Sequence, residues 1–126
     1  MFDYDLYQQF ATVREAVPRG EILHVFGDVD LATVGNLNEA IDEAVMDGGR
    51  LLVNLTKCRY FDSSGLAALI RARKRLGTRL TVLVQPQSQI LRIVRVAGLN
   101  EILNVVTELH AHVESMAAAN AVAESH

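Results

Sequence analysis

Residues 51–76, LLVNLTKCRYFDSSGLAALIRARKRL, predict a strand, a short polar connector and a helix in direct succession. The apolar run at 51–55 is typical of a buried strand, because it is short, continuous and followed by polar residues. From residue 66 onward, leucine and isoleucine recur at helical spacing, and a cluster of cap-forming residues precedes them. The stretch therefore places Ser63 and Ser64 in the first turn of a helix that follows a buried strand.

The whole chain has the size and composition of one globular domain. It contains 126 residues, half of them hydrophobic and about a fifth charged, and only its ends, 1–10 and 117–126, lack a clear pattern. The formal net charge of -3 argues against nucleic acid as a direct partner. No apolar stretch approaches the ~20 residues that a membrane span needs. A single cysteine, Cys58, and the absence of a signal-like N-terminal segment favour a reduced, cytoplasmic protein.

Strand and helix patterns alternate along the rest of the chain. Two β-rich segments flank the turn sequence Pro18-Arg19-Gly20, and the turn after residue 26 is expected to end the second of them. Asp30 or Thr33 is the candidate cap of the helix that follows. The expected strands are 13–17, 21–26, 51–55, 80–84 and 102–106, and the expected helices are 34–45, 62–76, 90–97 and 107–116. This order predicts an α/β fold: a mixed sheet of four to five strands with about four helices packed on it.

Several polar residues outside the serine motif have ordinary structural interpretations. Asp28 is expected in a polar turn, His24 on a strand, and Cys58 as a small buried apolar side chain. A basic run follows the serines on the same helix and beyond, at Arg71, Arg73, Lys74, Arg75 and Arg79. Such runs are usually solvated helix faces, and the functional alternative is that Arg71, Lys74 and Arg75 face an acidic partner. His110 and His112 are two residues apart, which is a poor spacing for a metal pair on a helix.

The sequence Asp62-Ser63-Ser64-Gly65-Leu66 resembles the Asp-Ser-Ser/Thr-Gly-Leu motif of STAS domains in bacterial anti-sigma factor antagonists. In that family the motif follows the third strand and opens a helix. Three further matches occur in the same order, at Gly27-Asp28-Val29-Asp30, Val53-Asn54-Leu55 and Ala97-Gly98-Leu99. The similarity extends from about residue 13 to residue 106. Asp28 departs from the more usual glutamate, and Ala67 from the glycine that many members carry.

The resemblance implies a phosphorylation switch in a protein that binds partners and is not an enzyme. The dephosphorylated antagonist binds an anti-sigma factor, itself a serine kinase, and thereby frees a sigma factor. The kinase phosphorylates the first serine of the motif, here Ser63, and a serine phosphatase reverses the reaction. No catalytic residue, metal, cofactor, membrane or direct nucleic-acid contact is implied. The implied partner surface consists of Asp30, Asp62, Ser63, Ser64, Gly65 and Leu66.

Local chemistry is compatible with this switch and also with a simpler role. A phosphate on Ser63 would lie at a helix N-terminus, where free N–H groups and the helix dipole stabilise an anion. Helix capping alone would equally explain serines at this place. If Asp62 is the cap, Ser63 stays free, and Ser64 is the second candidate for modification. Asp30 and Asp62 would add negative charge nearby if their loops share one sheet edge, and Gly65 would leave room for a partner.

Other functional classes are kept as alternatives. A STAS scaffold or transporter-associated binding module would use the same fold without the switch. A receiver domain that forms phospho-aspartate also carries acids at strand ends, here Asp28, Asp30 and Asp62, but Gln85 stands where such domains keep a lysine. A serine hydrolase is disfavoured because the motif is not Gly-x-Ser-x-Gly, and no phosphate-binding P-loop sequence is present.

Overall fold

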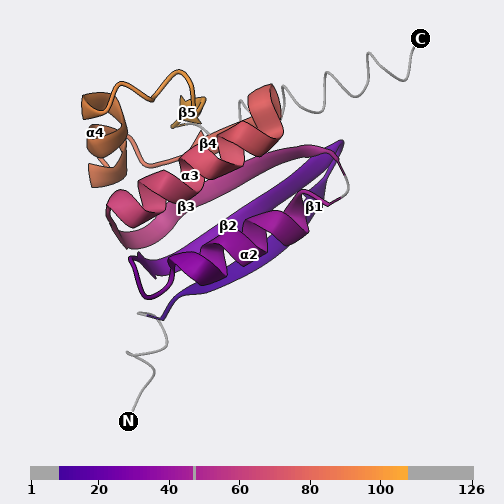
Figure 1. Ribbon diagram of the computed structural model, residues 1–126, viewed down its shortest axis with the longest axis horizontal. Coiled ribbons are helices and arrows are strands. Elements are labelled where there is room, and N and C mark those ends of the chain that lie inside the picture. The colour runs from indigo at the N-terminus through magenta and orange to yellow at the C-terminus, as the bar shows by residue number, and fades with distance from the viewer. Residues whose placement is uncertain (1–8, 47, 108–126) are drawn as a thin grey trace.

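The computed structural model describes residues 9–46 and 48–107. These residues form a five-stranded sheet in the order β1-β2-β3-β4-β5, with α2 and α3 lying side by side over it (Figure 1). The elements are β1 (Ala11–Val17), β2 (Gly20–Val29), α2 (Val34–Ala44), β3 (Arg50–Phe61), α3 (Ser63–Leu76), η1 (Gly77–Arg79), β4 (Leu80–Leu83), α4 (Gln89–Val96) and β5 (Val105–Val106). The predicted α/β class with a mixed sheet is confirmed.

Strand pairing combines one hairpin with a parallel sheet. β1 pairs antiparallel with β2, whereas β2–β3, β3–β4 and β4–β5 are all parallel. Each parallel strand after β2 is added beside its predecessor, and the three successive crossovers contain α2, α3 and α4. A receiver domain has the strand order 2-1-3-4-5 and lacks such a hairpin. The observed order therefore excludes the receiver alternative.

The hairpin turn forms where the sequence predicts it. Val17 pairs with Gly20, so Pro18 and Arg19 are the two central residues, and Arg19 has a φ of 66°. Across the hairpin, the Arg14 guanidinium donates two hydrogen bonds of 2.6 Å to the Glu21 carboxylate. These bonds hold the pKa of Glu21 below its usual value.

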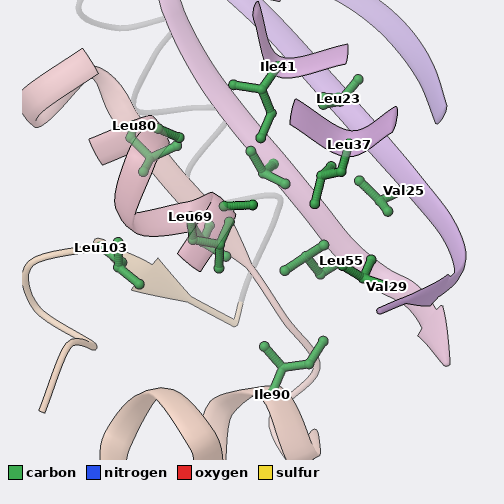
Figure 2. Packing of buried hydrophobic residues seen from close by; sticks show 14 of the residues in the cluster. Leu23, Val25, Val29, Leu37, Ile41, Leu55, Leu69, Leu80, Ile90 and Leu103 are labelled. Carbon is green, nitrogen blue, oxygen red and sulfur yellow. The ribbon is translucent and has the colours of Figure 1, made fainter. Parts of the chain in front are cut away.

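The main core lies between the sheet and the helices (Figure 2). Fully buried side chains come from β2 (Leu23 and Val25), α2 (Leu37 and Ile41) and α3 (Leu69). A smaller cluster of Ile22, Leu52 and Leu83 alternates with these core positions along the strands, so it faces the opposite side of the sheet. β3 and α3 both contribute several side chains to the larger core, which is why the apolar pattern of residues 51–76 is so clear in the sequence.

Two strands continue past the C-terminal end that the sequence predicts. β2 continues to Val29, because Gly27 adopts a φ of 85° inside the strand and two register irregularities follow His24 and Gly27. A Cβ on Gly27 would meet the Gln9 carbonyl oxygen at 2.4 Å, so the glycine allows a close chain crossing and does not end the strand. β3 likewise continues through the expected polar connector to Phe61.

The C-terminal elements differ in length or lie outside the description. β5 contains only Val105 and Val106, because residues 100–104, which include the first three residues of the strand expected at 102–106, form turns. The helix predicted at 107–116, with His110 and His112, falls outside the described residues from residue 108 onward. Three α-helices are described, against about four predicted for the whole chain. None of the described helices is long and apolar enough to cross a membrane.

Candidate functional site

The candidate site is the sheet edge at which β2 and β3 both end. In the parallel register Asp28 lies opposite Tyr60 and Val29 opposite Phe61. Asp30 and Asp62 are the next residues of their chains, so the two loops leave the sheet at the same level (Figure 1). The prediction that these two loops share one sheet edge is therefore confirmed.

Asp62, and not a serine, caps the serine helix. Asp62 has an extended backbone, and its Oδ1 accepts a 2.9 Å hydrogen bond from the Ser64 backbone N–H. Its Oδ2 lies 3.4 Å from the Tyr60 hydroxyl, which donates toward it. Ser63 is the first helical residue and is exposed, whereas Ser64 is half-buried. The cap therefore leaves the Ser63 hydroxyl available at the surface, as the sequence suggested.

A tight hydrogen-bonded turn carries the chain from β2 into α2. The Asp30 Oδ1 accepts hydrogen bonds from the backbone N–H groups of Ala32 at 3.0 Å and Thr33 at 3.1 Å. The Thr33 hydroxyl donates a 2.8 Å hydrogen bond to the Asp28 carbonyl, and it accepts one from the Asp30 N–H. Asp30 therefore holds the turn at residues 31–33 that precedes α2. Thr33 occupies the N-cap position of α2 without a side-chain cap hydrogen bond, and its hydroxyl fixes the loop to the end of β2.

Asp28 is part of β2 and not of a polar turn. One of its carboxylate oxygens is buried and lies 3.6 Å from the Arg59 guanidinium on the neighbouring strand. That spacing makes an ion pair without a hydrogen bond. Arg59 therefore compensates the charge of Asp28, whereas the described ion pairs include neither Asp30 nor Asp62.

Gly65 and Leu66 face the interior more than the sequence suggested. A Cβ on Gly65 would lie 2.4 Å from the Phe61 ring, so the missing side chain makes room for this buried aromatic residue. The expectation that Gly65 leaves space for an approaching partner is wrong for this reason. Leu66 is half-buried and packs against the main core. Asp30, Asp62, Ser63 and Ser64 remain at the surface of the edge to different extents.

Four of the five residues of the basic run make hydrogen bonds within the molecule. Arg71 and Arg75 both bond the Asp42 carboxylate on α2, which lowers the pKa of Asp42. Arg73 donates to the Ile102 carbonyl, and Arg79 donates to the Gly48 carbonyl. Two of the three residues considered for an acidic partner therefore connect α2 with α3.

A small polar groove adjoins the site where β3 extends beyond β4. β4 pairs only with residues 51–54 of β3, and the Gln85 side chain donates a 2.9 Å hydrogen bond to the Thr56 carbonyl. The groove has a volume of about 260 Å³ and lies between the end of β3 and the start of α4. Cys58 lies in its wall, and burial raises the pKa of this thiol to about 11. The structure agrees with a mainly buried, unreactive cysteine.

Two exposed apolar residues at this edge escaped the sequence analysis. Leu31, in the β2–α2 turn, is 82% exposed, and Tyr60, three residues before Ser63, is 48% exposed. The sequence did contain a signal for the exposure of Leu31. This leucine follows Asp30 in a turn and does not belong to the apolar pattern of the helix that comes next. The residues of this edge thus combine a free hydroxyl, two carboxylates and apolar side chains.

The described residues do not form a hydrolytic or metal-binding constellation at the serines. His24 contacts Glu15 at 2.7 Å and Asn54 at 2.9 Å, in the middle of the sheet and away from the serine edge. Among residues 9–46 and 48–107, no group of three metal-ligating side chains gathers.

Comparison with known proteins places this arrangement in a family context. The family described as "Mlab, STAS domain" matches residues 13–108. An anti-sigma-B factor antagonist of Listeria monocytogenes is 30% identical over 86 residues, which cover 66% of this chain and 75% of the relative.

Solved structures agree on the fold. An anti-sigma factor antagonist from Mycobacterium paratuberculosis superposes with a TM-score of 0.78 at 21% identity, covering 86% of this chain and 95% of the other. The Bacillus cell fate determinant SpoIIAA, in its phosphorylated form, gives a TM-score of 0.60 at 22% identity, with coverages of 83% and 99%. The family match extends through the sheet, the serine motif and all the described helices. The chain therefore belongs to the STAS domain family and is related to its anti-sigma factor antagonists.

Proposed function

We propose that this protein is an anti-sigma factor antagonist whose binding is switched off by phosphorylation of Ser63. In this proposal the unmodified protein binds an anti-sigma factor that is also a serine kinase, and a sigma factor is released. A serine phosphatase restores the binding form. The protein itself acts in the cytoplasm as a binding partner and kinase substrate, and it performs no catalysis.

The observation that carries the proposal is that Asp62 caps α3 while Ser63, the next residue, is exposed. Because Asp62 caps α3 through the Ser64 N–H, the Ser63 hydroxyl is exposed and is not needed to start the helix. A phosphate there would meet the positive end of a 14-residue helix and would not require the helix to unfold. The relationship to curated antagonists supports the same role.

The effect of a phosphate would be exerted on the partner. It would add roughly two negative charges and considerable volume to an edge that already carries Asp30 and Asp62. A partner surface that fits the free hydroxyl would then face uncompensated charge and a steric clash. Ser64 is a weaker candidate, because its half-buried side chain is less accessible to a kinase.

The test uses anti-sigma serine kinases of the source organism, purified one at a time, with ATP and magnesium. A cognate kinase should bind the wild-type protein, phosphorylate the peptide that contains Ser63, and then release it. The Ser63→Ala variant should stay bound in ATP, the Ser63→Asp variant should bind poorly without ATP, and Ser64→Ala should behave like wild type. Calorimetry and phosphopeptide mass spectrometry measure these outcomes.

The competing function is a constitutive STAS binding module or scaffold, including a transporter-associated one. Equal binding by Ser63→Ala and Ser63→Asp, together with an unmodified serine peptide, would favour that module and leave Ser63 as an ordinary surface residue beside the Asp62 cap.

A further inference from the structure

We infer that Leu31, supported by Tyr60, is the apolar anchor through which this edge docks into a pocket of its anti-sigma partner. The inference rests on the proposed function and adds to it the residue that supplies the binding affinity. Leu31 is among the most exposed large apolar side chains in the described part of the chain, at 82%. It projects from the loop that leaves the sheet beside the serine loop.

The position of Leu31 is held by the turn around it. Asp30 Oδ1 accepts hydrogen bonds from the backbone N–H groups of Ala32 and Thr33, the two residues that follow the leucine, and the Thr33 hydroxyl ties the loop to the Asp28 carbonyl at 2.8 Å. A leucine on such a fixed turn loses little conformational freedom when it is bound. Pre-organised apolar anchors of this kind contribute a large share of affinity at protein interfaces.

Neighbouring residues define the chemistry of the expected pocket. Tyr60 adds a second partly exposed apolar surface on the adjoining strand, with its hydroxyl directed toward Asp62. Asp30 and Asp62 flank this surface with carboxylates that no described ion pair compensates, whereas Asp28 is paired with Arg59. We therefore expect the partner to present an apolar pocket with a basic rim. In the complex, Ser63 of this chain would lie at the border of that pocket.

Docking of Leu31 also explains how a modification of Ser63 would act. A dianion at the border of an apolar contact must lose water when the leucine enters its pocket, and this desolvation is unfavourable. Phosphorylation would then remove affinity without any movement of Leu31.

The test compares Leu31→Ser with Met46→Ser in calorimetric titrations against the cognate kinase without ATP. Met46 is 81% exposed and follows the far end of α2, at the opposite edge of the sheet, so it matches Leu31 in exposure but not in position. Leu31→Ser should weaken binding at least tenfold, Leu31→Met should bind within threefold of wild type, and Met46→Ser should leave binding within twofold. Circular dichroism melting checks that all three variants remain folded.

Three results would overturn the inference in distinguishable ways. If Leu31→Ser binds like wild type while Ser63→Asp does not, the switch stands and the anchor lies elsewhere. If no anti-sigma kinase binds the wild-type protein, the proposed function fails and the anchor fails with it. An equal loss for Leu31→Ser and Met46→Ser would show a general effect of surface polarity and would also contradict a localised anchor.

Discussion

At the sheet edge that carries the serines (the serine edge), helix capping and presentation of an exposed hydroxyl are performed by two different residues. The sequence motif alone does not show which residue does which. Asp62 supplies the helix cap, and Ser63 presents a free hydroxyl one residue later. The sequence alone indicated both possibilities, because aspartate and serine are both common caps. Their assignment depends on the backbone of Asp62, whose extended conformation directs the carboxylate to the Ser64 N–H.

Gly65 shows how a motif residue can be misassigned from sequence. Its bare position looked suitable for a partner, yet it accommodates the buried Phe61 ring. Whether the bare side of a helical glycine faces solvent or core depends on the rotation of α3 over the sheet. That rotation is set by long-range packing of residues such as Leu69, and it cannot be obtained from local propensity.

The Gly65→Ala substitution should destabilise the protein by about 1–2 kcal/mol. Overpacking against the Phe61 ring, 2.4 Å from the new Cβ, costs more than the better helix propensity of alanine returns. Urea unfolding followed by circular dichroism measures the change. In a Phe61→Leu background the same substitution should cost less, because the ring is gone. An unchanged cost in that background would show that the Phe61 contact is not its cause.

At the scale of elements, the sequence predicts the order and type of strands and helices better than their lengths. The helices α2, α3 and α4 lie within one or two residues of their expected ranges, because apolar periodicity and caps mark both ends. β3 runs six residues beyond its expected end, through Thr56 to Phe61, because Thr56, Lys57 and Arg59 interrupt the continuous apolar run on which the strand prediction rests. Pairing with β2 across two register irregularities extends it.

The β1–β2 hairpin provides a pH-dependent contribution to stability. The Arg14 guanidinium keeps the Glu21 carboxylate ionised below its usual pKa, so the pair stabilises the fold above about pH 4.3. This contribution is lost as the pH falls through the lowered folded-state pKa. Replacing Glu21 with glutamine should cost about 0.5–1 kcal/mol at pH 7, as expected for a bidentate pair near the surface.

Chemical denaturation at pH 7 and at about pH 3 tests this prediction. The stability difference between wild type and Glu21→Gln should shrink at the lower pH. Glu43→Gln, on the exposed face of α2 and without a described ion pair, should change stability little at either pH. A Glu21→Gln deficit that persisted in full at low pH would assign the loss to packing instead of charge.

At the scale of the whole molecule, the serine edge is supported by a continuous core and has little reason to rearrange. Leu23, Leu37 and Leu69 connect the sheet with α2 and α3, and Asp42 ties these two helices through Arg71 and Arg75. The overall α/β architecture was predictable because buried strands and amphipathic helices alternate. The exposure of Leu31 was not, since it depends on how a turn is held between distant segments.

The Ser63→Asp variant should therefore keep the wild-type fold. Its free energy of unfolding should remain within about 0.5–1 kcal/mol of wild type, with any change favourable, because an added carboxylate interacts well with a helix N-terminus. Backbone amide resonances should shift only around the β2–α2 and β3–α3 loops. Shifts that spread to β4 and β5 would indicate a conformational response and would contradict a purely local effect.

The Asp62 cap has a consequence for timing under the proposed switch. Since the first turn of α3 is already complete before Ser63 is modified, neither state has to wait for a helix to form or melt. The phosphorylated and unphosphorylated forms then share one backbone conformation and differ in one chemical group. The lifetime of each form would be set by the kinase that adds the phosphate and the phosphatase that removes it. A cell could therefore tune the response through the amounts of these two enzymes alone.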